Sequence, residues 1–212
     1  MLQMLAVAIV IQINNLAGAP PPVVRDAVRE VTRVYAAIDV RVESIEADAA
    51  VRDPAVVHVI VIGDETGALR HARDTVMGAT IWTTARTPIV YLFYRRVEAV
   101  SAKYASAVSM VFACTLAHEL GHVLMPDHPH APEGLMRASW RREELQRADQ
   151  GQLQFMPDDV ARIRSSTYVV SAFGRTATAR LTPGAAYGSL DPAVEDQRRD
   201  GARHQLEKDH CR

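Results

Sequence analysis

The stretch His118–His130 reads HELGHVLMPDHPH and holds four of the eight histidines in this chain of 212 residues. On an α-helix, side chains four positions apart lie on one face, one turn above each other. His118 and His122 can therefore bind one metal ion together, and zinc is the ion that an HExxH pair binds. Glu119 lies one position further round the helix, where it can take a proton from a water molecule that the zinc activates. The stretch predicts the site of a zinc hydrolase.

A catalytic zinc site needs a third protein ligand and leaves its fourth position open. Pro126 should end the helix, because proline disfavours the α conformation in the residue before it. The chain can then fold back, and we favour His128, six residues after His122, as the third ligand. His130 is the alternative, since two further residues give slack for the turn.

The composition excludes several classes of partner. With 24 basic and 25 acidic side chains the net charge is −1, so we expect no nucleic acid as a partner. The apolar run Leu5–Ile11 is far too short for a transmembrane segment. The chain is long enough for one domain whose core needs no disulfide, and its oligomeric state is left open.

The N-terminal run Leu5–Ile11 permits two interpretations. Ala17-Gly18-Ala19 is similar to a signal-peptidase site, yet no Lys or Arg precedes the run and Pro20 would follow the cut. We favour a buried first strand, which makes the chain as written cytoplasmic. The alternative is a secreted or periplasmic protein, if residues 1–19 act as a signal or the true start lies upstream.

Hydrophobic periodicity predicts the order of elements in the first half of the chain. Pro20-Pro21-Pro22 opens a helix that runs to about Ile38. The run Val56–Ile62 is almost entirely β-branched, which favours a central strand covered on both faces. Further strands are expected at Val40–Ile45, Gly78–Thr83 and Ile89–Tyr94, with a loop over residues 63–77.

Two helices and a tail are expected in the second half. Ser101–Met125 has the pattern of one long helix that carries HExxH in its last two turns. Pro157-Asp158-Asp159 starts a last helix, which should end near Ser166. From about Ser171 onward the chain lacks apolar periodicity, and we expect a disordered tail there.

HELGHVLMPDH resembles the zinc-binding signature of the metzincin proteases, HExxHxxGxxH, and Gly134-Leu135-Met136 is similar to their Met-turn. The likeness is closest to the matrixin branch, where the third histidine precedes the Met of the turn by eight residues, as His128 precedes Met136 here. One departure concerns Met125, which replaces the glycine of the family. The Met-Pro pair must turn in another way, because Met adopts a positive φ reluctantly.

The resemblance covers roughly residues 4–168 and implies an α+β fold: a mixed, twisted five-stranded sheet with an active-site helix and flanking helices. We expect one catalytic domain over residues 1–168. Residues 169–212 would form an appended tail. The resemblance also implies structural roles for Gly121 in the signature and for Met136 beneath the metal. A substrate would lie extended against the edge strand, which comprises Gly78, Ala79, Thr80, Ile81 and Trp82.

Together these observations lead to the hypothesis of a zinc-dependent endopeptidase acting on a peptide or protein substrate, with Zn²⁺ as cofactor and Glu119 as general base. One alternative is a catalytically silent, zinc-stabilised binding module on the same fold, although such a relative would usually have lost Glu119. Another is a zinc hydrolase whose third ligand is a downstream glutamate. Glu143 and Glu144 are available, but the histidines make a glutamate unnecessary.

Overall fold

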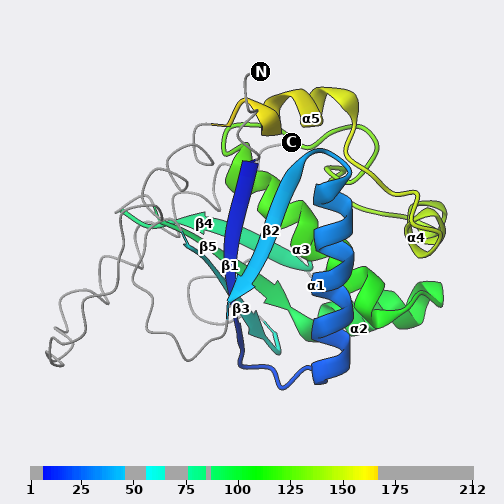
Figure 1. Ribbon diagram of the computed structural model, residues 1–212. Coiled ribbons are helices and arrows are strands. Elements are labelled where there is room, and N and C mark those ends of the chain that lie inside the picture. Colours follow the sequence, from blue (N-terminus) through cyan, green and yellow to red (C-terminus); the bar gives the residue numbers. More distant parts are fainter. Residues whose placement is uncertain (1–6, 46–55, 65–75, 85–86, 167–212) are drawn as a thin grey trace, which may run out of the picture.

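The computed structural model describes residues 7–45, 56–64, 76–84 and 87–166. These residues form five strands and five helices, in the α+β arrangement with a mixed sheet that was expected (Figure 1). The predicted tail, residues 169–212, lies outside the described residues, as does most of the loop expected at residues 63–77. Among the helices of the described part, none combines the length and the apolar character that crossing a bilayer requires.

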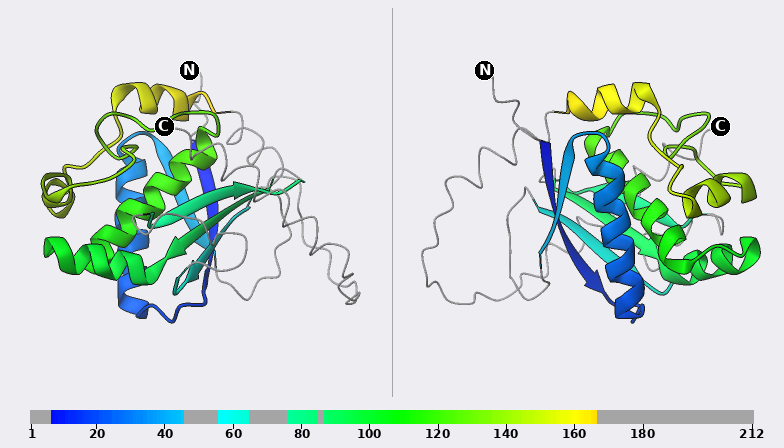
Figure 2. Two further views of the ribbon diagram at one scale, coloured as in Figure 1. Left: turned by 180° about the vertical axis from the view of Figure 1, so that it is seen from behind. Right: turned by 45° about the vertical axis from the view of Figure 1, so that its right-hand side comes forward.

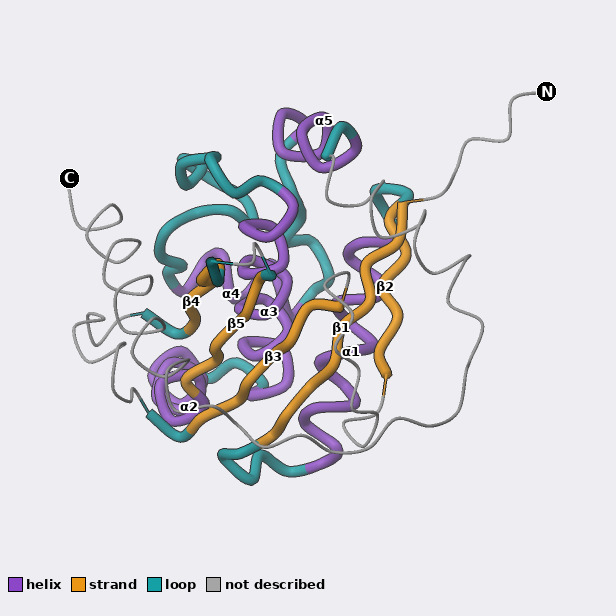
Figure 3. Tube along the Cα trace, turned by 90° about the vertical axis from the view of Figure 1, so that its left-hand side faces the viewer, coloured by secondary structure: helices purple, strands orange, loops and turns teal. Residues whose placement is uncertain are grey.

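The sheet has the strand order β2-β1-β3-β5-β4, which can be followed in Figure 3. Four strands run parallel, namely β1 (Val7–Asn15), β2 (Val40–Ile45), β3 (Val56–Ile62) and β5 (Pro88–Phe93), and β4 (Gly78–Trp82) pairs antiparallel with β5. The strand expected in the first apolar run is therefore present as β1, with a neighbour on each side. β3 is central as predicted, and its Val57, Val59 and Val61 are fully buried.

Two helices, α1 (Pro21–Ala36) and α3 (Val108–Leu124), pack against each other on one face of the sheet (Figure 2). α1 begins at a proline, whose fixed φ suits the first turn of a helix, and it is buried along one side. α3 is buried on almost all sides because it contacts α1, β4 and β5. Most of the HExxH segment is therefore buried, and only His122 within it is half-buried.

The prediction of one long helix over Ser101–Met125 was wrong. α2 (Tyr94–Tyr104) ends at Ala105, which has φ 55°, and α3 starts three residues later. The break is closed by two hydrogen bonds: the Ser106 N–H donates to the Ser101 carbonyl (3.1 Å), and the Ser101 hydroxyl donates to the Ser106 carbonyl (2.6 Å). An alanine in the left-handed region costs about 1–2 kcal/mol, and no hydrophobic pattern signals it.

Two short helices follow the HExxH stretch. α4 (Arg142–Asp149) lies in a polar segment, and the Glu144 side chain closes its first turn by accepting from the Arg141 N–H (2.8 Å). α5 (Pro157–Arg164) starts at the predicted proline and ends two residues before the expected end. It lies across the C-terminal end of α3 (Figure 1), beside the loop through which the chain leaves that helix.

Candidate metal centre

The Nε2 atoms of three histidines converge near the C-terminal end of α3. His122 Nε2 lies 3.0 Å from His118 Nε2 and 3.2 Å from His130 Nε2. The possible ligand atoms of all three side chains lie within 4.8 Å of one another. His118 is buried, His122 is half-buried and His130 is exposed, so the cluster is accessible from the side of His130.

This set of donor atoms fits a zinc ion. Tetrahedral coordination with Zn–N bonds of about 2.0–2.1 Å places the ligand nitrogens roughly 3.3 Å apart. The two Nε2 separations of 3.0 and 3.2 Å are close to that value. Neutral imidazoles that turn their acceptor nitrogens toward one another need a cation or a proton between them. Three protein ligands would leave the fourth position open for chemistry.

His118 has the tautomer that such a ligand requires. Its Nδ1 lies 2.8 Å from the backbone carbonyl oxygen of Leu135. A carbonyl can only accept, so Nδ1 carries the proton and Nε2 keeps its lone pair for the cluster. The Trp140 ring packs perpendicular to the imidazole, with centroids 5.7 Å apart. Both contacts hold the His118 ring in one orientation.

Burial keeps the two helical imidazoles neutral. It lowers the pKa of His118 to about 4, and the hydrogen bond to Leu135 opposes this change only in part. The pKa of His122 falls to about 2, first through burial and then through repulsion from His118 and His130. Because a neutral imidazole need not lose a proton before it binds a metal ion, the cluster is suited to zinc at neutral pH.

His128, which we favoured as the third ligand, does not join this cluster. Its Nε2 lies 3.0 Å from Asp159 Oδ1 on α5, and because a carboxylate only accepts, this Nε2 carries a proton. The structure brings the alternative, His130, into the cluster in its place. The reason lies at Met125, where φ is −134° instead of the positive value of a glycine turn, so the chain leaves α3 along another path.

Glu119 is held by strand β4. The side chain is buried, and the Thr80 hydroxyl lies 2.8 Å from its Oε2 and 3.0 Å from its backbone oxygen. Gly78 lies two residues before Thr80 and therefore on the same face of the strand. A Cβ atom there would lie 2.8 Å from Glu119 Cγ and Oε1, so the glycine provides the space that the carboxylate occupies.

Met136 and Gly121 are in direct contact. Met136 is fully buried, and a Cβ atom added to Gly121 would lie 2.4 Å from its Sδ. The turn before Met136 uses Gly134 with φ 75°, and the Leu135 N–H donates to the Gln154 carbonyl at 2.9 Å. Since the Leu135 carbonyl also accepts from His118, this turn supports that histidine directly.

The strand expected to bind substrate, β4, forms an edge of the sheet. Over the residues that the structure describes, β4 pairs with β5 alone. Gly78 is buried, whereas Ala79, Thr80, Ile81 and Trp82 are half-buried.

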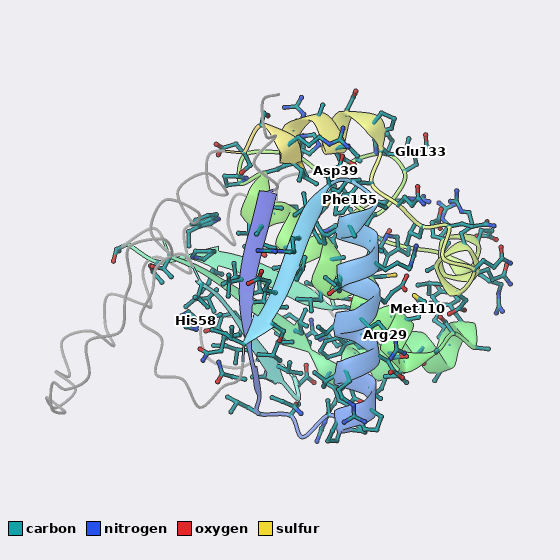
Figure 4. All side chains as sticks on the ribbon, in the orientation of Figure 1. Arg29, Asp39, His58, Met110, Glu133 and Phe155 are labelled. Carbon is teal, nitrogen blue, oxygen red and sulfur yellow. The ribbon has the colours of Figure 1, made fainter. Side chains whose placement is uncertain are left out.

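Another histidine, His58 on β3, lies apart from the cluster. It alternates with the buried Val57 and Val59, which face α1 and α3, so it points to the opposite side of the sheet (Figure 4).

From the sequence we did not identify several of the residues that shape the site, or we assigned them another role. Thr80 was named only as an edge-strand residue, although the alternation of strand faces could have placed it toward the HExxH helix. Asp159 lies 31 positions from His128, so no local pattern connects them. Trp140 lies against His118, and its Nε1 is the one buried side-chain nitrogen or oxygen in the described residues without a hydrogen-bond partner.

Comparison with models of known protein families gives no match, and comparison with curated proteins gives none either. Among solved structures, the fold is similar to that of a zinc-dependent peptidase from Methanocorpusculum labreanum (strain Z). The two structures superpose with a TM-score of 0.50 at 14% sequence identity, over 72% of this chain and 99% of that chain. The likeness shows a common fold, whereas the chemistry must be argued from the residues of the site.

Proposed function

We propose that this protein is a zinc-dependent peptidase. The observation that carries the proposal is the convergence of three Nε2 atoms, from His118, His122 and His130, at the end of the helix that also carries Glu119. The common fold with a protein described as a zinc-dependent peptidase supports the same conclusion. In this proposal the three histidines are the zinc ligands, and the packing of Met136 under Gly121 supports a metzincin-like site.

When bound, zinc would activate a water molecule and polarise the carbonyl group of the scissile peptide bond. Glu119 accepts the proton of the water and delivers it to the leaving amine. The arrangement suits this role because the Thr80 hydroxyl fixes Oε2 of the carboxylate. Glu119 also extends from the same turn of α3 as His118 and His122, but it is not a member of the histidine cluster.

A peptide substrate would bind in extended form along β4. This strand pairs only with β5 in the described part of the chain, so its other edge can offer backbone groups to one further strand. Binding of this kind relies on backbone hydrogen bonds, which favours cleavage within a chain over removal of a terminal residue. We therefore propose that the protein is an endopeptidase that accepts substrates with varied side chains.

Zinc analysis of the purified protein, combined with cleavage of a peptide library with and without a zinc chelator, tests this function. We expect about one zinc per chain and a hydrolysis rate that the chelator abolishes and added zinc restores. Hydrolysis at full rate by metal-free protein would contradict the proposal. Stoichiometric zinc without cleavage of any library peptide would instead indicate the zinc-stabilised binding module.

A further inference from the structure

We propose that the His128–Asp159 pair is a positioning device that holds His130 in place as the third zinc ligand. The inference rests on the proposed zinc site and concerns residues 125–131, here called the ligand loop. This loop leaves the C-terminal end of α3 and leads to the turn at Met136.

Backbone hydrogen bonds fix the two ends of the ligand loop. At the first end, the Met125 N–H donates to the Gly121 carbonyl (2.8 Å) and the His128 N–H donates to the Met125 carbonyl (3.0 Å). At the last end, the Ala131 N–H donates to the Met136 carbonyl (2.9 Å). The His128 side chain adds a third attachment, since it ties the middle of the loop to α5 through Asp159.

Asp159 is a rigid partner for this attachment. It is 1% exposed, and its second carboxylate oxygen accepts a hydrogen bond from the Met156 N–H (3.1 Å) at the start of α5. The N-terminal turn of a helix stabilises a negative charge, so the carboxylate is held both by geometry and by the helix dipole. The hydrogen bond that His128 donates is therefore charge-assisted and directed at a fixed acceptor.

Pro129 connects the anchored imidazole to the one that faces the metal site. Its ring fixes its own φ and restricts His128, the residue before it, to extended conformations. Fixing His128 therefore limits the directions in which the His130 side chain can extend from the backbone. His130 is the exposed member of the histidine cluster, so it depends more on the path of the loop than the two helical histidines do.

The two histidines of the ligand loop thus have different roles, because one donates a hydrogen bond through Nε2 and the other presents an Nε2 lone pair. The His128 Nε2–H donates a hydrogen bond to Asp159 Oδ1, so this nitrogen has no lone pair for a metal ion, whereas His130 Nε2 lies 3.2 Å from His122 Nε2. Losing the anchor should weaken zinc binding without removing a ligand. Losing His130 should remove the ligand itself.

The test is the zinc dissociation constant of the full chain, measured by competition with a chelator for the variants His128→Ala, Asp159→Ala and the double variant. We expect each single change to weaken zinc binding by about tenfold. Changes to residues that hold the metal ligands in place typically weaken metal binding by about 10–100-fold, and this expectation is at the lower end of that range. The double variant should bind zinc no more weakly than Asp159→Ala alone, because both changes remove the same His128–Asp159 contact and only Asp159→Ala also removes the acceptor of the Met156 N–H. All three should still bind one zinc per chain when zinc is saturating.

Two further variants serve as controls. Asp158→Ala removes a neighbouring negative charge from the same helical turn, but this side chain is exposed, so zinc affinity should stay unchanged. His130→Ala should lose stoichiometric zinc. The melting temperature of each zinc-free variant separates a positioning role from a merely structural one. If Asp159→Ala fails to fold, the ratio of zinc affinities between wild type and His128→Ala decides the question.

The proposal is overturned if His128→Ala binds zinc as tightly as wild type, or if the two single effects add. It is also overturned if His128→Ala abolishes stoichiometric binding while His130→Ala retains it, since His128 would then be the ligand. A wild-type protein that binds no zinc would refute the site as well. The zinc-affinity assay contains no peptide, so its results do not depend on whether the protein cleaves peptides. A failure of the proposed peptidase activity would be seen only in the cleavage assay.

Discussion

Glu119 Oε2 accepts a hydrogen bond from the hydroxyl of Thr80, which lies 39 positions earlier in the chain. Gly78, on the same strand, leaves the space into which the carboxylate fits. A hydrogen bond to a charged group contributes roughly 1.5–3 kcal/mol. The proposed general base is thus oriented by the sheet as well as by its own helix.

Replacing Thr80 with Val removes the hydroxyl and keeps the shape of the side chain. We expect the rate of peptide hydrolysis to fall by about tenfold, because the base is no longer held in one orientation. Zinc content should not change. Thr80→Ser is the matched control, since it keeps the donor and should retain most of the activity. Wild-type hydrolysis by the valine variant would show that Thr80 does not orient the base.

The sequence could predict the residues of the site whose relation is set within one helix. His118, Glu119 and His122 are placed by the period of the α-helix alone. The third member of the cluster could not be predicted in the same way, because it depends on how the chain turns at Met125 and on the distant acceptor Asp159. The matrixin spacing therefore favoured His128, whereas in the structure His130 lies with His118 and His122.

α3 and the turn at Met136 approach each other closely at Gly121. Gly121 has no side chain, and Met136 Sδ occupies the position next to it, with Phe155 on the far side of the same space. A glycine inside a helix costs about 1 kcal/mol relative to alanine. Here that cost is offset by the close approach of the turn that supports His118.

Gly121→Ala should lower the free energy of unfolding of the zinc-free protein, measured with a chemical denaturant. The added methyl group would lie 2.4 Å from Met136 Sδ. Because Met136 is fully buried, its thioether has no free space to move into, so overpacking should cost about 2–3 kcal/mol, more than the gain of about 1 kcal/mol in helix propensity.

The double variant Gly121→Ala, Met136→Ala is the control for this prediction. It should cost less than the sum of the single variants, because the methyl group fills part of the space that the thioether leaves. A more stable Gly121→Ala protein would contradict the packing described.

Most elements could be predicted because their patterns are local. The β-branched run of β3 and the proline starts of α1 and α5 were confirmed. The break between α2 and α3 could not be predicted, since Ala105 adopts a left-handed conformation that two serine hydrogen bonds close. α4 also escaped prediction because its first turn is closed by Glu144, which in addition pairs with Arg137.

The candidate metal site is continuous with the main core of the protein. Leu135 and Trp140, which contact His118, and Met136, which packs against Gly121, belong to the same buried cluster as the strands and α1. The division into a domain of residues 1–168 and a tail of residues 169–212 stays a prediction. Because His118 is buried in this core, the free energy of unfolding should depend on pH.

The free energy of unfolding of the zinc-free protein should decrease as the pH falls. In the unfolded chain a histidine titrates near its ordinary pKa of 6.5, whereas burial lowers the pKa of His118 to about 4 in the folded protein. Protons therefore bind the unfolded chain first, and stability present above about pH 6.5 is lost progressively toward about pH 4. Between about pH 7.5 and about pH 5, His118 should account for a loss on the order of 2 kcal/mol.

His118→Asn is the control for this pH dependence, because asparagine keeps a donor for the Leu135 carbonyl but does not titrate. The difference in unfolding free energy between about pH 7.5 and about pH 5 should be smaller in the variant than in the wild type. An equal difference would show that His118 is not held in its neutral form by burial.

The rate of peptide hydrolysis by the variant Glu119→Gln tests whether the protein is a zinc-dependent peptidase with Glu119 as its general base. Glutamine has the shape of glutamate but cannot accept the proton, so peptide hydrolysis should fall by a factor of about 10²–10⁴. The variant should still bind about one zinc per chain, because Glu119 is not a member of the histidine cluster. Hydrolysis at the wild-type rate by the zinc-loaded variant would contradict the account.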